Sequence, residues 1–89
     1  MMVELFYTDG CASCVAFKDE LRAAVLCSEP TAVWRDVDPV KELDYAVELG
    51  VASLPSVAID GKLVFTSLPS AEQLRKAVLA RRAEVSRGR

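Results

Sequence analysis

The sequence predicts one α/β domain with the element order β-α-β-α-β-β-α, which gives a four-stranded mixed sheet and three helices. In the first half of the 89 residues, short runs of β-forming residues alternate with segments whose apolar residues recur at helical spacing. In the second half, Asp60 and Gly61 separate two apolar runs, as is typical of a two-residue hairpin. Hydrophobic residues make up 52% of the chain, so residues 1–89 can bury one core and form a single domain.

The first strand and the first helix are separated by a turn. Val3–Tyr7 is rich in β-forming residues and almost entirely apolar, which predicts a buried central strand. Asp9 and Gly10 end this strand, and a helix of about four turns begins at Cys11. Its predicted apolar face consists of Cys14, Phe17, Leu21 and either Ala24 or Val25.

A second strand and a second helix follow. Pro30 ends the helical pattern, and Ala32–Val37 reads as a strand of β-branched and aromatic residues. Asp38 and Pro39 are expected to provide the N-cap and the first-turn proline of the next helix, which Gly50 ends. The apolar face of this helix is expected to hold Leu43, Ala46 and Val47. Two strands joined by a helix of this length pair in parallel.

The second half of the chain adds an antiparallel hairpin and a last helix. Ser56–Ile59 and Lys62–Phe65 are the two strands of the hairpin. Ser70 and Gln73 have the spacing of a capping box, which predicts the start of the helix. Residues that can cover the sheet from this helix are Leu74, Ala77 and Val78. After about Arg82 the chain is expected to fray, so residues 83–89 are predicted to be a tail.

The charge pattern limits the classes of partner. The formal net charge is −2, and the only basic cluster comprises Arg81, Arg82, Arg87 and Arg89, so no nucleic acid is expected to bind. The longest apolar stretch, Ala23–Cys27, is far shorter than the roughly 18 residues that span a bilayer, and the N-terminus lacks the features of a signal peptide. We therefore expect a cytoplasmic protein with no membrane partner.

The pair formed by Cys11 and Cys14 indicates redox chemistry. A helix N-terminus carries free N–H groups and about half a positive charge, which favour a thiolate in the first turn. Cys11 lies where it is most acidic, and the spacing of three places Cys14 one turn later and deeper in the protein. Cys11 is therefore predicted to be a nucleophile, and Cys14 the residue that resolves a mixed disulfide.

Other interpretations of the cysteines stay open. A structural disulfide is disfavoured in a reducing compartment, and a metal site is short of ligands because the chain has no histidine and only Cys27 as a third cysteine. A metal site within one chain would need carboxylates to complete it, whereas two chains could hold a metal or an iron–sulfur cluster between them. The two thiols can also be small packing residues. Cys27 itself, at the far end of the helix, is predicted to be a packing residue, with a regulatory thiol as the alternative.

Three segments resemble thioredoxins and glutaredoxins, and most closely the short thioredoxin-like proteins of prokaryotes. Phe6–Cys14, followed by Lys18, is similar to the strand, turn and Cys-x-x-Cys helix of this superfamily. Gly50–Val57 resembles the segment that holds its cis-proline, and Ile59–Lys62 resembles the hairpin that follows. Together the three segments span the chain from Phe6 to Lys62.

The resemblance implies a thioredoxin-like fold and a thiol–disulfide oxidoreductase that reduces protein disulfides through Cys11 and Cys14. It further implies that Pro55 is cis and faces the cysteine pair, with the backbone of Leu54 binding an extended substrate segment. No cofactor is expected. The expected partners of this monomer are protein disulfides and an upstream thiol or flavin reductase. The alternatives are a glutaredoxin-like or metal-binding module of the same fold, or a non-catalytic adaptor.

The sequence also departs from both branches of the superfamily. Leu5 falls near the position at which thioredoxins carry a buried acid, so the sequence predicts no dedicated proton shuttle there. Asp9 stands in the turn where glutaredoxins usually carry a basic residue. It is interpreted as a solvated turn residue, with the alternative that its carboxylate opposes thiolate formation at Cys11. Thr66–Pro69 replaces the glycine segment of the glutathione-using proteins, which disfavours glutathione as the dedicated reductant. Lys18, one turn after Cys14, is either a solvated residue or one that affects the local potential.

Overall fold

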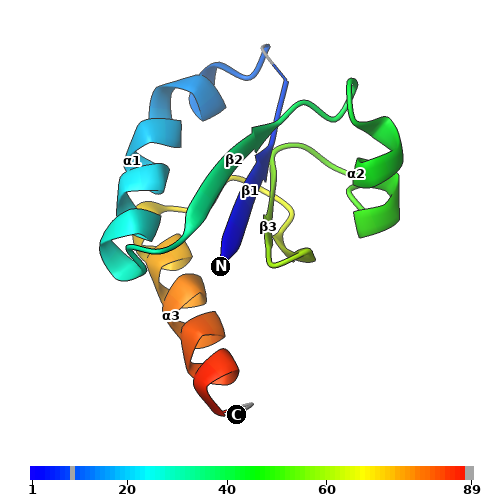
Figure 1. The fold of residues 1–89 in the computed structure, drawn as a ribbon. Helices are drawn as coiled ribbons and strands as arrows, with labels where there is room; N and C mark the ends of the chain where they lie inside the picture. The colour runs from blue at the N-terminus through cyan, green and yellow to red at the C-terminus, as the bar shows by residue number, and fades with distance from the viewer. Residues whose placement is uncertain (9, 88–89) are drawn as a thin grey trace.

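The computed structural model describes residues 1–8 and 10–87 and has the predicted order of elements (Figure 1). The strands are β1 (Met2–Phe6), β2 (Val33–Val37), β3 (Ser56–Ile59) and β4 (Lys62–Phe65). The helices are α1 (Ala12–Ser28), α2 (Leu43–Leu49) and α3 (Ala71–Arg87). The α/β fold class, with four strands in one mixed sheet and three helices, is confirmed.

The sheet has the strand order β2-β1-β3-β4, with β1 in its interior. β1 pairs in parallel with β2 and antiparallel with β3, and β4 pairs antiparallel with β3. Phe6, at the end of β1, is the partner of Val37 in β2 and of Ser56 in β3. We call the end of the sheet formed by these three residues the cysteine end, because the chain leaves β1 there toward Cys11. The chain also enters β3 there, directly after Pro55.

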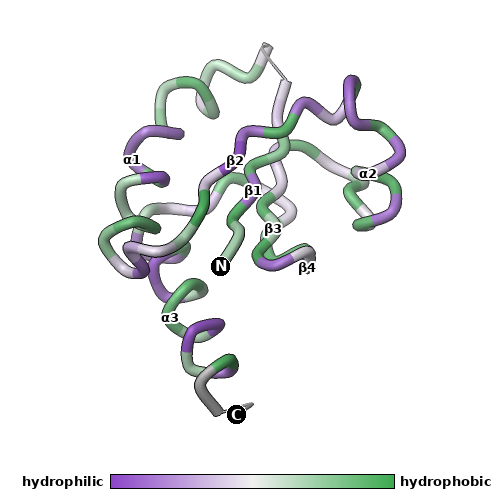
Figure 2. The backbone as a smooth tube through the Cα atoms, in the orientation of Figure 1, coloured by the Kyte–Doolittle hydropathy of each residue, from purple (hydrophilic) through white to green (hydrophobic). Residues whose placement is uncertain are grey.

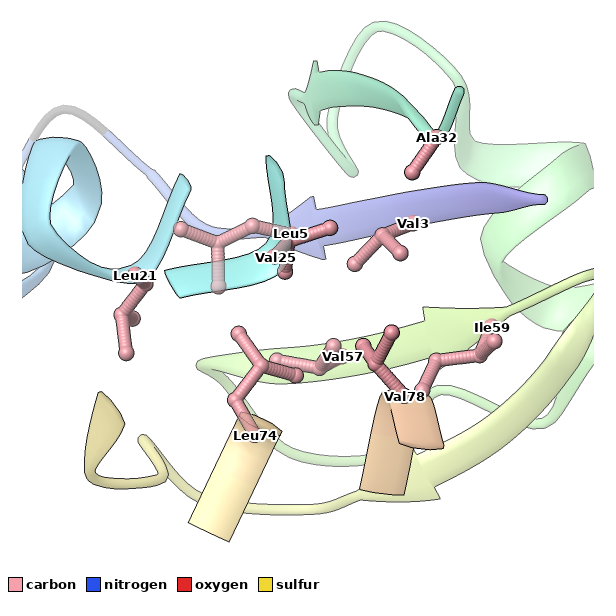
Figure 3. Packing of buried hydrophobic residues seen from close by; sticks show 9 residues of the cluster. All are labelled: Val3, Leu5, Leu21, Val25, Ala32, Val57, Ile59, Leu74 and Val78. Carbon is pink, nitrogen blue, oxygen red and sulfur yellow. The ribbon is translucent and has the colours of Figure 1, made fainter. Parts of the chain in front are cut away.

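The two faces of the sheet are covered unequally. Figure 1 shows α1 and α3 on one side of the sheet and α2 on the other. Alternate residues of β1 point to opposite faces because the side-chain period of a strand is two. The larger core lies under α1 and α3, where side chains of both helices point toward those of β1 and β3 (Figure 3). Its buried members are Val3, Leu5, Leu21, Val25, Ala32, Val57, Ile59, Leu74 and Val78. The smaller core, under α2, contains Phe6, Val37, Ala46 and Ala58.

Helix α1 is amphipathic, as predicted, and its buried residues are Cys14, Leu21 and Val25. Purple and green segments alternate along α1 and α3 in Figure 2, which is the expected pattern for helices with one apolar face. Phe17 differs from the prediction because half of its surface is exposed. It lines a shallow groove with Leu68 and Pro69 instead of entering the core.

Helix α2 starts later than the sequence predicts. The Asp38 carboxylate accepts a hydrogen bond from the Val40 N–H at 2.9 Å, which closes a turn before the helix, so Asp38 is not the N-cap. Pro39 is buried in this turn and does not begin the helix, which starts at Leu43. The predicted stop is confirmed, because Gly50 takes the left-handed conformation at the C-terminal end with φ 86°.

The predicted apolar face of α2 is only partly buried. Ala46 packs in the smaller core and is 3% exposed. Leu43 and Val47 are 60% and 66% exposed, because the helix turns Tyr45, Ala46 and Leu49 toward the sheet instead.

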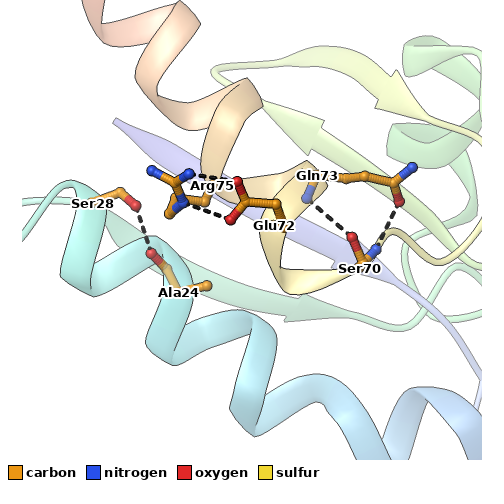
Figure 4. A network of polar contacts seen from close by, with 6 residues as sticks. All are labelled: Ala24, Ser28, Ser70, Glu72, Gln73 and Arg75. Atoms are coloured by element: carbon orange, nitrogen blue, oxygen red, sulfur yellow. Dashed lines mark hydrogen bonds and ion pairs between the residues drawn. The ribbon is translucent and has the colours of Figure 1, made fainter.

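The hairpin and the last helix follow the sequence prediction closely. Asp60 and Gly61 both have positive φ, at 51° and 77°, as the predicted two-residue turn requires. The capping box is present (Figure 4): the Gln73 N–H donates to the Ser70 Oγ at 3.1 Å, and the Ser70 N–H donates to the Gln73 Oε1 at 2.9 Å. Helix α3 continues to Arg87, so residues 83–87 are helical rather than frayed. Within the described residues, no helix has both the length and the apolar character needed to cross a membrane.

Candidate functional site

The cysteine pair lies at the start of α1, as the sequence predicts. Cys11 is the N-cap residue and is joined to Cys14 by a disulfide, with 5.3 Å between the two Cα atoms. The Cys11 Sγ also accepts a hydrogen bond from the Cys14 N–H at 3.3 Å. The first turn of the helix therefore points an N–H group at the sulfur of Cys11, which stabilises negative charge on that sulfur after reduction.

The two sulfurs differ in their access to solvent. Cys11 is partly exposed, whereas Cys14 is 0% exposed. An incoming disulfide can therefore reach the Cys11 sulfur from solvent. The Cys14 sulfur is shielded from solvent and lies next to the Cys11 sulfur, with which it can react. This asymmetry provides the arrangement needed for a two-step exchange of disulfides.

The loop before β3 lies at the cysteine end of the sheet. The Leu54–Pro55 peptide bond is cis, which confirms the expectation from the resemblance. Leu54 is 45% exposed, so part of this residue is open to solvent. Two hydrogen bonds of Ser53 hold the loop: its carbonyl accepts from the Ser56 Oγ at 2.6 Å, and its hydroxyl donates to the Thr66 carbonyl at 2.9 Å.

Beside the cysteine helix lies a group of paired polar side chains from three elements. The Lys18 Nζ on α1 donates a 3.2 Å hydrogen bond to the Tyr7 Oη and lies 3.7 Å from an Asp36 carboxylate oxygen on β2. The Trp34 indole N–H donates to the other Asp36 oxygen at 2.9 Å. The hydrogen bond to Tyr7, and next the charge of Asp36, raise the pKa of Lys18. The ammonium group of Lys18 is therefore fixed by contacts with Tyr7 and Asp36 and is not only solvated.

Sequence reasoning missed a buried carboxylate in β1. Glu4 is 2% exposed, and its Oε1 accepts a 2.5 Å hydrogen bond from the Tyr45 hydroxyl of α2. Its Oε2 lies 3.6 Å from Arg35 Nη1, and Arg35 also pairs with Glu42. The bond to Glu4, together with partial burial, raises the pKa of Tyr45 to about 12. The only signal in the sequence was a charged residue inside a strand that is otherwise apolar.

The position of Glu4 decides what it can do for the cysteines. Its partners are Tyr45 of α2 and Arg35 of β2, and α2 covers the face of the sheet opposite α1, so the Glu4 side chain lies on that face. Leu5, which the resemblance places near the position of the family's buried acid, belongs to the core beneath α1. Glu4 therefore does not replace that acid. Asp9, the other carboxylate singled out by the sequence, lies outside the described residues.

Cys27 is not the packing residue that the sequence analysis predicted. It is exposed near the end of α1 and carries a free thiol. Two helical positions separate it from the buried Val25, which turns its side chain about 200° away from the core. Across residues 1–8 and 10–87, no three His, Cys, Asp or Glu side chains are grouped to hold a metal ion.

A four-stranded mixed sheet, a cysteine pair at a helix N-terminus and a cis-proline before β3 together define a thiol–disulfide oxidoreductase of thioredoxin-like fold. The chain belongs to the thioredoxin domain family, whose model matches residues 1–79. It is 31% identical over 77 residues to a thioredoxin of Methanothermobacter thermautotrophicus, an alignment that covers 85% of this chain and 96% of the relative.

A comparison of structures agrees on the fold. Thioredoxin 1 of the thermophilic eubacterium Thermosipho africanus superposes with a TM-score of 0.74 at 20% sequence identity. The superposition covers 98% of this chain and 99% of the other. The likeness to thioredoxins therefore extends over the whole domain and is not limited to the cysteine segment.

Proposed function

We propose that this oxidoreductase reduces disulfide bonds in other proteins, with Cys11 as the nucleophile and Cys14 as the resolving residue. The observation that carries the proposal is the asymmetry of the pair at the helix N-terminus. The Cys11 sulfur is accessible and receives an N–H from the helix, whereas the Cys14 sulfur is fully buried next to it.

The reaction proceeds in two exchanges. The Cys11 thiolate attacks one sulfur of a substrate disulfide, forms a mixed disulfide and releases the first substrate thiolate. The Cys14 thiolate then attacks the Cys11 sulfur, forms the Cys11–Cys14 disulfide and releases the second substrate thiolate. Two electrons have passed to the substrate, and each released thiolate takes up a proton from solvent. An upstream thiol or flavin reductase returns the two electrons to the pair.

We assign the binding of the substrate to the loop before β3. Leu54 is exposed and Pro55 directly precedes the β3 residue that pairs with Phe6, so both lie at the end of the sheet from which the chain runs to Cys11. The backbone of Leu54 would pair with an extended segment of the substrate, which accommodates many sequences. Such a reductase is expected to act as a monomer in the cytoplasm, where thiols are kept reduced.

Three cysteine variants test the proposal with insulin as the disulfide substrate. Cys11→Ser is expected to abolish turnover, because the accessible nucleophile is lost. Cys14→Ser is expected to accumulate a mixed disulfide, which mass spectrometry detects as an adduct that dithiothreitol removes. Cys27→Ser is the matched control and should leave turnover unchanged, since this exposed thiol lies at the other end of α1. Turnover by Cys11→Ser, or no adduct with Cys14→Ser, overturns the proposal.

A further inference from the structure

The resolving step has an electrostatic difficulty that the cysteine pair does not solve by itself. Cys14 must lose its proton before it can attack, yet it is 0% exposed, and burial in apolar surroundings disfavours a thiolate. The residue of β1 beneath α1 is Leu5, and the carboxylate of Glu4 lies on the other face of the sheet. No carboxylate of β1 is therefore placed to accept the Cys14 proton, and ionisation of Cys14 would be favoured by a positive charge nearby.

The ammonium group of Lys18 can supply this positive charge, since Lys18 lies on the same helix as Cys14. A spacing of four residues places Lys18 one turn after Cys14 on the same face of α1, and helical side chains lean back toward the N-terminus. Its ammonium group is fixed by the Tyr7 hydroxyl and the Asp36 carboxylate rather than spread through solvent. The titratable groups that face it are Tyr7 after β1, Asp36 on β2 and Asp19 on its own helix.

From this geometry, and resting on the proposed function, we propose that Lys18 is a positioning residue that favours the Cys14 thiolate during resolution of the mixed disulfide. Tyr7 holds the cation in place, and Asp36 balances part of its charge. In the step concerned, the Cys14 sulfur forms a bond to the Cys11 sulfur, and the bond between Cys11 and the substrate breaks. The electron pair leaves on the substrate sulfur, and the proton of Cys14 has already passed to water.

The proposal predicts a specific change in the pH profile of resolution. Without the positive charge, the midpoint of the profile is expected to rise by about one pH unit, which is a tenfold change in the ionisation equilibrium of Cys14. A thiol of higher pKa is also more nucleophilic once ionised, with a Brønsted coefficient of about 0.4–0.5. At pH values below the midpoints of both the wild-type and the Lys18→Gln profiles, the variant should therefore resolve the mixed disulfide about threefold more slowly than the wild type. At pH values above both midpoints, it should resolve it about threefold faster. A merely structural role of Lys18 does not produce profiles that cross.

The experiment uses the reduced protein in a Cys27→Ser background with a small excess of 5,5′-dithiobis(2-nitrobenzoate). Attack by Cys11 releases the first thionitrobenzoate at a rate proportional to the reagent. Attack by Cys14 releases the second at a rate independent of the reagent, and this second rate is measured against pH. Lys18→Arg should keep the wild-type midpoint because it keeps the charge. Asp36→Asn should lower the midpoint because it removes the balancing charge.

The control for the removal of a positive charge is Lys62→Gln. Lys62 lies on β4 next to the Asp60–Gly61 turn, at the opposite end of the sheet from the cysteines. This variant should have the wild-type profile, and thermal unfolding checks that all variants are folded. A wild-type protein without a reagent-independent second phase contradicts the proposed function itself. If the wild type shows that phase and Lys18→Gln has the same profile, the inference about Lys18 is wrong and the proposed function stands.

Discussion

The hydroxyl of Tyr45 donates a 2.5 Å hydrogen bond to the carboxylate of Glu4, which is 2% exposed in β1. This bond joins α2 to β1, one of the two interior strands of the sheet. In Tyr45→Phe the ring and its contact with Phe6, at 5.9 Å between centroids, are kept, but a buried carboxylate oxygen loses its partner. Such a loss costs about 1–3 kcal/mol. Urea unfolding of the oxidised protein measures it, and a change of less than about 0.5 kcal/mol contradicts the prediction.

The same hydrogen bond predicts how stability changes at alkaline pH. The folded state raises the pKa of Tyr45 from its ordinary value of 10.0 to about 12, mainly through the bond to Glu4. Below pH 10 the phenol is protonated in both states, so its contribution to stability is complete; it is lost progressively as the pH rises toward 12. In Tyr45→Phe this part of the alkaline loss should be absent. The oxidised protein is used because its disulfide cysteines do not titrate.

An ultraviolet titration provides an independent measurement of this prediction. The wild-type protein should show a tyrosine that ionises only near pH 12, and Tyr45→Phe should lack that late change in absorbance. A wild-type spectrum without this late ionisation would show that Glu4 does not hold the phenol of Tyr45.

Gly50 is predicted to be required for its backbone conformation alone. Its φ is 86°, and a Cβ at this position would meet nothing within 4 Å, so Gly50→Ala adds strain without a clash. The left-handed conformation costs a non-glycine residue about 1–2 kcal/mol. Gly10→Ala is the matched control, since its Cβ would meet only the Thr8 Oγ1 at 4.0 Å and its φ is not positive. We expect a lower unfolding midpoint for Gly50→Ala only; equal midpoints contradict this explanation.

The exposure of the three cysteines predicts how many thiols react. In the oxidised protein only Cys27 is free, so iodoacetamide should label one residue per folded chain. After reduction all three cysteines are available, and the buried Cys14 should react more slowly than Cys11. Mass spectrometry of peptides distinguishes the sites. A Cys27 that stays unlabelled in the folded protein contradicts its exposure.

Most of the fold was predictable because local chemistry determines the ends of its elements. The Asp60–Gly61 turn and the Ser70 capping box each depend on residues within a few positions of one another, and both occur as predicted. The bounds of β3 and β4 also agree with the sequence analysis. Asp38 was ambiguous for the same reason, since one carboxylate can cap a helix or close a turn, and here it bonds Val40 in a turn.

The parts of the site that were missed depend on contacts between distant segments. Glu4, Arg35 and Tyr45 come from three elements, and their grouping follows from the strand register, in which Glu4 is the partner of Arg35. No local pattern contains that information. The partners of Lys18 are of the same kind. The exposure of Cys27 was different, because the helical angle between it and Val25 already indicated it.

The arrangement of the sheet also bears on how the chain acquires its fold during synthesis. β1 is the first element of the chain, so it leaves the ribosome before β2 and β3, the two strands that pair with it. Its edge toward β2 stays unpaired until Val37 has been made, and its edge toward β3 until Ile59 has been made. The core beneath α1 stays open until Leu74 and Val78 follow. Unpaired apolar strands are sites of wrong association between chains. The nascent protein is therefore most vulnerable to aggregation before α3 emerges, and the last part of its protection comes late in synthesis.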